Sequence, residues 1–194
     1  MVKIGGGLLR AQGGDGLRRA CAETAALATR RPVLVVPGGG PFADAVRAVD
    51  GLVGLGDDLA HALALRAMDQ FGAVLRPLLD GCAVTGELTA PRGLTLVRAE
   101  PAFGDRPEIP RSWAVTSDSL AVFAAAAAGV GEALLLKPVS PGITALTASQ
   151  LAALQAEGGA DFVDGYLARA VRDTGVAVTV RPPAVAGGTR ITAA

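Results

Sequence analysis

The chain has 194 residues, of which 51% are hydrophobic and 19% are charged, a composition that excludes an intrinsically disordered protein. Its 18 Lys and Arg residues balance 18 Asp and Glu residues, so no basic surplus indicates nucleic acid as a partner. One histidine and two distant cysteines, Cys21 and Cys82, exclude a His-rich metal site and a disulfide framework. The length fits a single domain over residues 1–194.

Nothing in the sequence marks a targeting or membrane-spanning segment. The most apolar stretch, residues 120–136, is rich in alanine, contains two glycines and is interrupted by Glu132, so it is too short and too weak to span a bilayer. We therefore expect a cytoplasmic protein without a membrane partner. The positive mean hydropathy also suggests apolar surface that a homo-oligomer would bury.

Two short apolar runs near the start of the chain each lead into three glycines. Residues 2–4 precede glycines 5–7, and the valine-rich residues 33–36 precede a turn that contains glycines 38–40. Continuous apolar runs of this length are typical of strands buried on both faces. The helical spacing of the segment between them predicts a helix over residues 15–29.

The rest of the chain alternates between helical and strand-like patterns. Asp57 or Asp58 is placed to cap a long apolar helix over residues 59–75, which is also a candidate for building an oligomer. The other expected elements are a helix over 42–49, strands at 83–85 and 94–97, a loop over 100–111, a helix over 117–128, a strand at 133–137, a helix capped by Thr147, a helix over 162–172, and strands at 176–180 and 189–192. This alternation predicts an α/β sandwich with a mainly parallel sheet.

The only two lysines of the chain, Lys3 and Lys137, both lie where an expected strand ends, whereas the other 16 basic residues are arginines. Ligands of parallel α/β sheets bind at the carboxyl ends of the strands, where glycines let backbone N–H groups approach an anion. Keeping a compact ammonium at two such positions favours a polyphosphate site. The structural alternative is that the lysines face water and the glycines only form turns.

Asp118 follows Ser117 at the start of an expected helix. A carboxylate there stabilises the helix dipole, which is the structural interpretation. The functional interpretation is that Asp118 positions the two lysines near bound phosphates. The sequence alone leaves both interpretations open.

Taken in order, these segments resemble the amino acid kinase family over essentially the whole chain. The segments that carry the resemblance are Val-Lys-Ile-Gly-Gly-Gly at 2–7, Val-Val-Pro-Gly-Gly-Gly at 35–40, Thr-Ser-Asp-Ser-Leu-Ala at 116–121, Leu-Leu-Lys at 135–137 and Gly-Thr-Arg-Ile at 188–191. A second set is similar to a small archaeal and methylotroph branch of the family, which includes a kinase of methanofuran biosynthesis. That set is His61, Ala-Met-Asp-Gln-Phe-Gly at 67–72, Trp113 and Val-Asp-Gly-Tyr at 163–166.

The resemblance implies a three-layer α/β/α sandwich with a mainly parallel central sheet, assembled as a dimer or larger homo-oligomer. It implies transfer of a phosphoryl group from ATP to an acceptor oxygen of a small molecule, possible substrates being those of a C1-carrier cofactor pathway. Mg²⁺ would be bound mainly through the phosphates, with no metal-ligating side chain assigned. The implied catalytic residues are Lys3, Lys137 and Asp118. The implied phosphate and nucleotide contacts are Gly5, Gly6, Gly7, Gly39, Gly40 and Ser117, and the implied acceptor contacts are Gly38, His61 and Arg66.

Two departures from the family pattern keep other functions open. Gly7 stands where many relatives have serine, so one hydroxyl contact is absent, and Pro-Val-Ser-Pro-Gly at 138–142 replaces a longer nucleotide loop. One alternative is a non-catalytic protein that binds an anion or a nucleotide in the same cradle. The other is a structural subunit of an oligomer, with His61 at an interface and Trp113 as a packing or lid residue.

Overall fold

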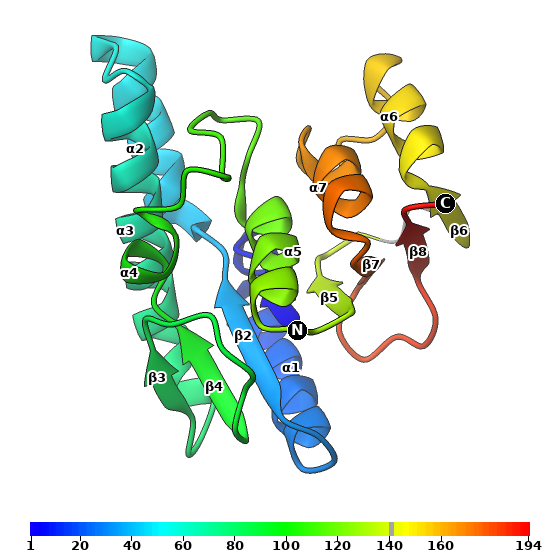
Figure 1. The fold of residues 1–194 in the computed structure, drawn as a ribbon. Helices are drawn as coiled ribbons and strands as arrows, with labels where there is room; N and C mark the ends of the chain where they lie inside the picture. Colours follow the sequence, from blue (N-terminus) through cyan, green and yellow to red (C-terminus); the bar gives the residue numbers. More distant parts are fainter. Residues whose placement is uncertain (140–141) are drawn as a thin grey trace.

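In the computed structural model, which describes residues 1–139 and 142–194, eight strands form one sheet with helices packed on it (Figure 1). The strands are β1 (Val2–Ile4), β2 (Val33–Pro37), β3 (Ala83–Thr85), β4 (Leu94–Val97), β5 (Glu132–Leu136), β6 (Ala145–Thr147), β7 (Ala177–Arg181) and β8 (Thr189–Thr192). The helices are α1 (Gly7–Ala28), α2 (Gly40–Val53), α3 (Asp57–Leu75), α4 (Ala99–Phe103), α5 (Ser117–Ala127), α6 (Ala148–Ala156) and α7 (Leu167–Thr174), with a 3-10 turn, η1, at Arg76–Leu78.

The sheet is mainly parallel, as the sequence predicts. Its strand order is β3-β4-β2-β1-β5-β7-β8-β6, and only the β7–β8 pair is antiparallel. Strand β1 lies between β2 and β5, and Ile4 is in register with both Pro37 and Leu136. The carboxyl ends of these three strands therefore lie side by side, and the segments that follow them meet at one edge of the sheet.

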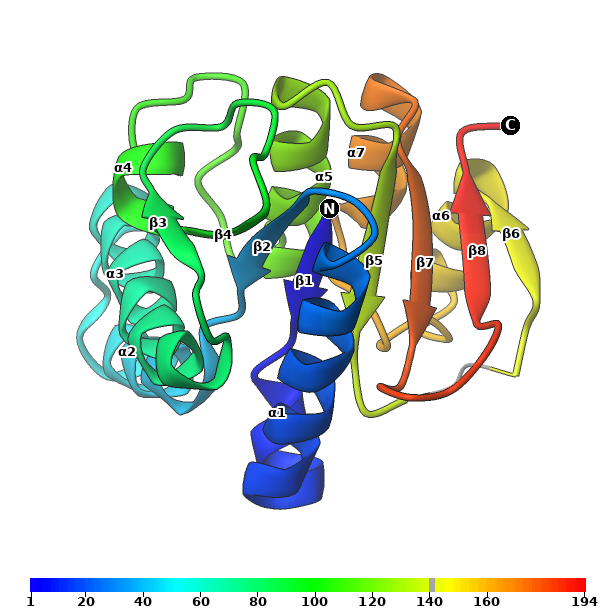
Figure 2. The ribbon, with the colours of Figure 1, turned by 90° about the horizontal axis from the view of Figure 1, so that it is seen from below.

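The helices cover the two faces of the sheet unequally. Helices α5, α6 and α7 pack on one face, where Leu135, Val178 and Ile191 belong to the larger buried core. On the other face, α1 packs on β1 and β2 together with the C-terminal half of α3. Figure 2 shows no described helix in front of β7, β8 and β6 on that face. The third layer of the α/β/α sandwich is thus confined to the β1 side of the sheet.

Helices α2 and α3 form an antiparallel hairpin beside the sheet (Figure 1). The apolar stripe of α3 is buried inside the molecule, so it does not provide the exposed interface that the sequence suggests. Its buried residues are Ala60, Leu65, Ala67, Met68, Phe71, Gly72 and Leu75. Exposed apolar side chains lie instead near the turn of the hairpin, at Val49, Leu52, Val53 and Leu59. The oligomer remains a prediction.

The structure differs from the sequence expectation mainly at helix starts. Helix α1 begins at Gly7, directly after the first glycine turn, and is interrupted at Gly13, whose φ is 60°. Helix α2 likewise begins within the second glycine turn, at Gly40. Glycine has a low helix propensity, and this conceals both helix starts in the sequence. Each glycine turn therefore carries the N-terminus of a helix.

Other differences are small. Strand β6 is not among the expected elements, and α4, at Ala99–Phe103, overlaps the start of the expected loop over residues 100–111. Helix α7 begins at Leu167, later than the expected start at 162. Thr147 caps α6 as expected, through a reciprocal capping box with Gln150.

No helix in the described part of the chain is both long and apolar enough to cross a membrane. The segment 138–142, which replaces the longer nucleotide loop of the family, falls partly outside the described residues, because 140 and 141 are not among them.

The two glycine turns pack backbone against backbone. A Cβ atom on Gly6 would lie 2.2 Å from the Cα of Gly40, and one on Gly38 would lie 2.7 Å from the amide nitrogen of Gly6. Gly40 also has a φ of +55°, and a Cβ there would lie 2.7 Å from the ring of Phe71. Side chains at these positions would push the two helix starts apart, so the glycines bring the turns together.

We expect Gly6→Ala to lower the free energy of unfolding by about 2 kcal/mol, because the added methyl group has no space beside Gly40. Gly7→Ala is the matched control, since a Cβ at Gly7 makes only ordinary contact, 3.7 Å from Pro138. Urea unfolding followed by circular dichroism measures both. Equal stability of the two variants would contradict the packing argument.

Candidate active site

The candidate site lies where β1, β2 and β5 end. Lys3 is the middle residue of β1, Lys137 directly follows β5, and Asp118 lies in the first turn of α5, which packs over all three strands. Gly5 donates its backbone N–H to the carbonyl of Leu136 at 3.0 Å, which extends the sheet into the first glycine turn. The structure thereby brings together the three residues that the sequence assigns to catalysis.

Asp118 forms an ion pair with each lysine. Its Oδ1 lies 2.7 Å from the Nζ of Lys3, and its Oδ2 lies 2.6 Å from the Nζ of Lys137. Asp118 and Lys3 are only 2% and 4% exposed, whereas Lys137 is partly accessible. The arrangement places two ammonium groups around one carboxylate and leaves one net positive charge, which suits an anionic ligand at the accessible side.

The electrostatics keep Asp118 ionised. Burial alone would raise its pKa, but the charges of Lys3 and Lys137 outweigh burial and lower the pKa to about 2. Burial lowers the pKa of Lys3 below its ordinary value, an effect that Asp118 opposes and Lys137 reinforces. At neutral pH Asp118 is therefore a fixed negative charge that holds both lysine side chains in place.

Asp164 fixes the start of α5 and, through it, Asp118. Its carboxylate accepts hydrogen bonds from the backbone N–H and hydroxyl of Thr116, both at 2.9 Å, and from the backbone N–H of Ser119, also at 2.9 Å. It accepts two more from the Ser119 hydroxyl and the Tyr166 backbone. The backbone N–H of Asp164 in turn donates to Oδ2 of Asp118 at 3.2 Å. Asp164 therefore caps α5 from outside the helix.

The environment of Asp164 is unfavourable for a charge unless those donors are present. Burial and the nearby Asp118 raise its pKa, while the hydrogen bonds from Ser119 and Thr116 act in the opposite direction. The Val-Asp-Gly-Tyr segment at 163–166 carries part of the family resemblance, but the sequence does not indicate a place for Asp164 in the site. It is 46 residues from Asp118, and no local pattern indicates the contact.

Four backbone N–H groups of the glycine turns have no acceptor in residues 1–139 and 142–194. They belong to Gly6, Gly7, Gly39 and Gly40. All four lie at the first positions of α1 and α2, where helical N–H groups lack partners within the helix and the helix dipole is positive. Together with the two lysines they provide hydrogen-bond donors and positive charge for a phosphate chain at one edge of the sheet.

The other expected site residues are more dispersed. Gly5 and Gly38 use their N–H groups inside the sheet edge, and Ser117 is the first residue of α5, with no hydrogen-bond partner for its hydroxyl among the described residues. Arg66 forms an exposed ion pair with Glu100 at 2.7 Å, outside the cradle. Among the described residues, no three His, Cys, Asp or Glu side chains converge as a metal site would require.

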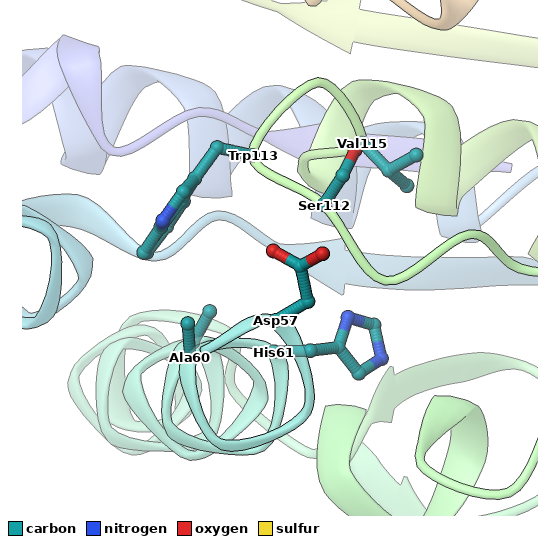
Figure 3. Close-up of a pocket in the computed structure, with 7 residues that line it drawn as sticks. Asp57, Ala60, His61, Ser112, Trp113 and Val115 are labelled. Carbon is teal, nitrogen blue, oxygen red and sulfur yellow. The ribbon is translucent and has the colours of Figure 1, made fainter. Parts of the chain in front are cut away.

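His61 lies in a separate pocket between α3 and the segment that precedes α5 (Figure 3). Trp113 and Val115 form part of its wall, and Val115 precedes Asp118 by three residues in the chain. The Trp113 indole donates to the Asp50 carboxylate at 2.6 Å, so Trp113 is tied to α2. The structure thus brings His61 and Trp113 together in a pocket that neither Lys3 nor Lys137 lines.

Asp164→Asn is expected to lower the free energy of unfolding by about 2 kcal/mol, because the amide turns a donor toward backbone and hydroxyl groups that now donate to Asp164. Asp161→Asn, an exposed change in the same loop, is the control and is expected to stay within about 0.5 kcal/mol of the parent protein. Chemical denaturation measures both. A parent-like Asp164→Asn protein would show that the α5 cap contributes nothing.

Comparisons with known proteins agree with the fold and identify the family. The family model for the amino acid kinase family matches residues 1–144. The chain is 26% identical over 114 residues to the [5-(aminomethyl)furan-3-yl]methyl phosphate kinase of Methanocaldococcus jannaschii. That alignment covers 56% of this chain and 53% of the relative, so the chain matches about half of the relative's length.

Solved structures of kinases share the fold. The uridylate kinase of Archaeoglobus fulgidus superposes with a TM-score of 0.74 at 16% identity, covering 98% of this chain and 99% of that one. The aspartate kinase of Synechocystis superposes with a TM-score of 0.68 at 16% identity, covering 100% of this chain and 39% of that one. At such low identity the superpositions establish the architecture alone.

Proposed function

We propose that this chain, which belongs to the amino acid kinase family, is a phosphotransferase that moves the γ-phosphoryl group of ATP to a small-molecule acceptor. The observation that carries the proposal is the Lys3–Asp118–Lys137 cluster beside the four glycine N–H groups that have no acceptor among the described residues. Phosphoryl transfer requires positioning and charge stabilisation more than a dedicated base, and this site offers both.

The glycines and the charged residues of the site have different roles in the proposed reaction. The backbone N–H groups of Gly6, Gly7, Gly39 and Gly40 hold phosphate oxygens at two helix N-termini. The ammonium groups of Lys3 and Lys137 neutralise the charge that develops on the transferring group, and Asp118 keeps both at a fixed spacing. ATP supplies the phosphoryl group when bound, with Mg²⁺ coordinated mainly by the phosphates.

The relative from M. jannaschii suggests the acceptor. Its name describes a kinase of a phosphate monoester whose furan ring carries an aminomethyl group. We propose the same chemical class for this chain, a small aromatic phosphate of a C1-carrier cofactor pathway. We further propose that the protein works in the cytoplasm. We also propose that it forms a homo-oligomer, which the exposed apolar residues at the α2–α3 turn support.

A non-catalytic nucleotide- or anion-binding protein is the second candidate. Gly7 favours it, because the first turn lacks a hydroxyl that would contact the phosphates. The paired lysines favour the enzyme, because binding alone does not require a buried carboxylate to hold two ammonium groups at one spacing. A nucleotide-binding protein would differ from the enzyme in turnover, and an anion-binding protein would differ from it in ATP binding as well.

We expect Lys137→Ala and Asp118→Asn each to slow single-turnover transfer by at least a hundredfold, with [5-(aminomethyl)furan-3-yl]methyl phosphate as acceptor. Lys137→Arg should stay impaired, because a planar guanidinium does not replace a compact ammonium. In the double variant the losses should be less than multiplicative, because residues that act as one unit are not lost twice.

The controls separate chemistry from folding and from binding. Arg30→Ala, a change of an exposed residue beyond the C-terminal end of α1, should keep the parent rate. ATP–Mg²⁺ should raise the melting temperature of the parent protein by mass action. A parent protein that is stabilised by ATP but transfers nothing to the acceptor would favour the second candidate. Full activity in a folded Lys137→Ala protein would contradict the assignment of Lys137.

A further inference from the structure

The backbone that carries Lys137 is held by hydrogen bonds on both sides. The carbonyl of Leu136 accepts the backbone N–H of Gly5, in the first glycine turn, at 3.0 Å. The backbone N–H of Lys137 donates to the carbonyl of Arg181, the last residue of β7, also at 3.0 Å. The position of the Lys137 backbone therefore depends on the position of the end of β7.

The end of β7 is tied to α1 by an ion pair. Figure 2 shows β7 in the part of the sheet that no described helix covers on the α1 side. Arg181 is in register with Leu136, which belongs to the core beneath α1, so both side chains lie on that face. The Arg181 guanidinium forms an ion pair with the carboxylate of Glu23, a residue of α1. Only 15% and 17% of the two side chains are exposed, so salt screens this pair less than it screens a surface pair.

Glu23 also holds the turn that follows β7. Its other carboxylate oxygen accepts the backbone N–H of Ala184 at 2.7 Å. The Arg181 guanidinium in turn donates to the carbonyl of Pro182 at 3.0 Å. Ala184 has a φ of 59°, and it is the only non-glycine residue with a positive φ within residues 1–139 and 142–194. Alanine rarely adopts this conformation, so the hydrogen bond to Glu23 stabilises a strained turn.

Lys137 and Lys3 differ in how their backbones are supported. Lys3 is the middle residue of β1 and is in register with residues of β2 and β5 on its two sides. Lys137 comes after the last residue of β5, where the sheet ends. A shift of the end of β7 would therefore move Lys137 relative to Asp118 and Lys3. Displacements of about 1 Å are enough to slow an enzymatic step strongly.

We propose that Glu23 is a positioning residue for Lys137 and acts through Arg181 and the turn at Ala184. The ion pair fixes the end of β7, and the end of β7 fixes the backbone from which the Lys137 side chain extends. The inference rests on the proposed function, in which Lys137 neutralises the transferring phosphoryl group. It gives α1 a second role, because the N–H groups at its start are already assigned to the phosphates.

The chain has only two lysines, so the position of Lys137 can be followed without measuring activity. Protein labelled with ¹³C at the lysine Cε atoms gives two NMR signals, and Lys137→Ala identifies the signal of Lys137. Glu23→Gln removes the charge at nearly constant size. It should shift the Lys137 signal and lower its order parameter, while the order parameter of Lys3 stays unchanged. Glu132→Gln, which removes an exposed ion pair with Arg190 between β5 and β8, is the matched control and should leave both signals unchanged.

Single-turnover transfer measures the consequence for the reaction. Glu23→Gln should lower the rate at saturating ATP by about tenfold and leave the ATP concentration for half-maximal rate within twofold of the parent value. Arg181→Gln breaks the ion pair from its other side and should give the same loss. In a Lys137→Ala background Glu23→Gln should cost nothing further, because residues that act as one unit are not lost twice. A merely structural role would lower the melting temperature and leave the rates of the folded protein, checked by circular dichroism, unchanged.

An unchanged Lys137 signal in folded Glu23→Gln protein would overturn the proposal, and so would an equal loss of rate in the parent and Lys137→Ala backgrounds. Failure of the proposed function is distinguishable. A protein whose lysine signals respond as expected but which transfers no phosphoryl group retains the positioning role and loses the kinase. A protein that transfers the group equally fast with and without the Glu23 charge does the reverse.

Discussion

The structure of the site depends on one buried carboxylate held between two ammonium groups. Asp118 is almost inaccessible to water, and removing its charge would leave the buried ammonium of Lys3 without a compensating partner. The two lysines and Asp118 together carry one net positive charge. An anion that binds at Lys137, the most accessible of the three, would neutralise this charge. The geometry of the fold therefore favours a phosphate at this edge of the sheet.

Three structural features place that carboxylate. The register of β1 with β2 and β5 aligns the strand ends that carry the lysines. Close contact between the glycine turns brings the starts of α1 and α2 to the same edge. Asp164 caps α5 from a distant loop, and its own backbone N–H contacts Asp118. Asp164 is half-buried, and the hydrogen bonds that the start of α5 donates to it stabilise its charge there.

Much of this arrangement is predictable from the sequence, and the reasons differ between its parts. Buried parallel strands have continuous apolar runs, so β1, β2 and β5 and the lysines at their ends are recognisable locally. The helix starts at Gly7 and Gly40 are not, because glycine's low helix propensity hides a start that tertiary packing imposes. The role of Asp164 depends on a contact across 46 residues, which no local spacing encodes. The same holds for the tether between Trp113 and Asp50.

The central claim is that Lys3 and Lys137, held by Asp118, face the transferring phosphoryl group. The most direct measurement is a crystal structure of the protein with Mg²⁺ and a non-hydrolysable ATP analogue. The account predicts γ-phosphate oxygens within about 3 Å of the Nζ atoms of Lys3 and Lys137, with the β-phosphate against the N-termini of α1 and α2. A nucleotide bound with its phosphates away from both lysines would contradict it.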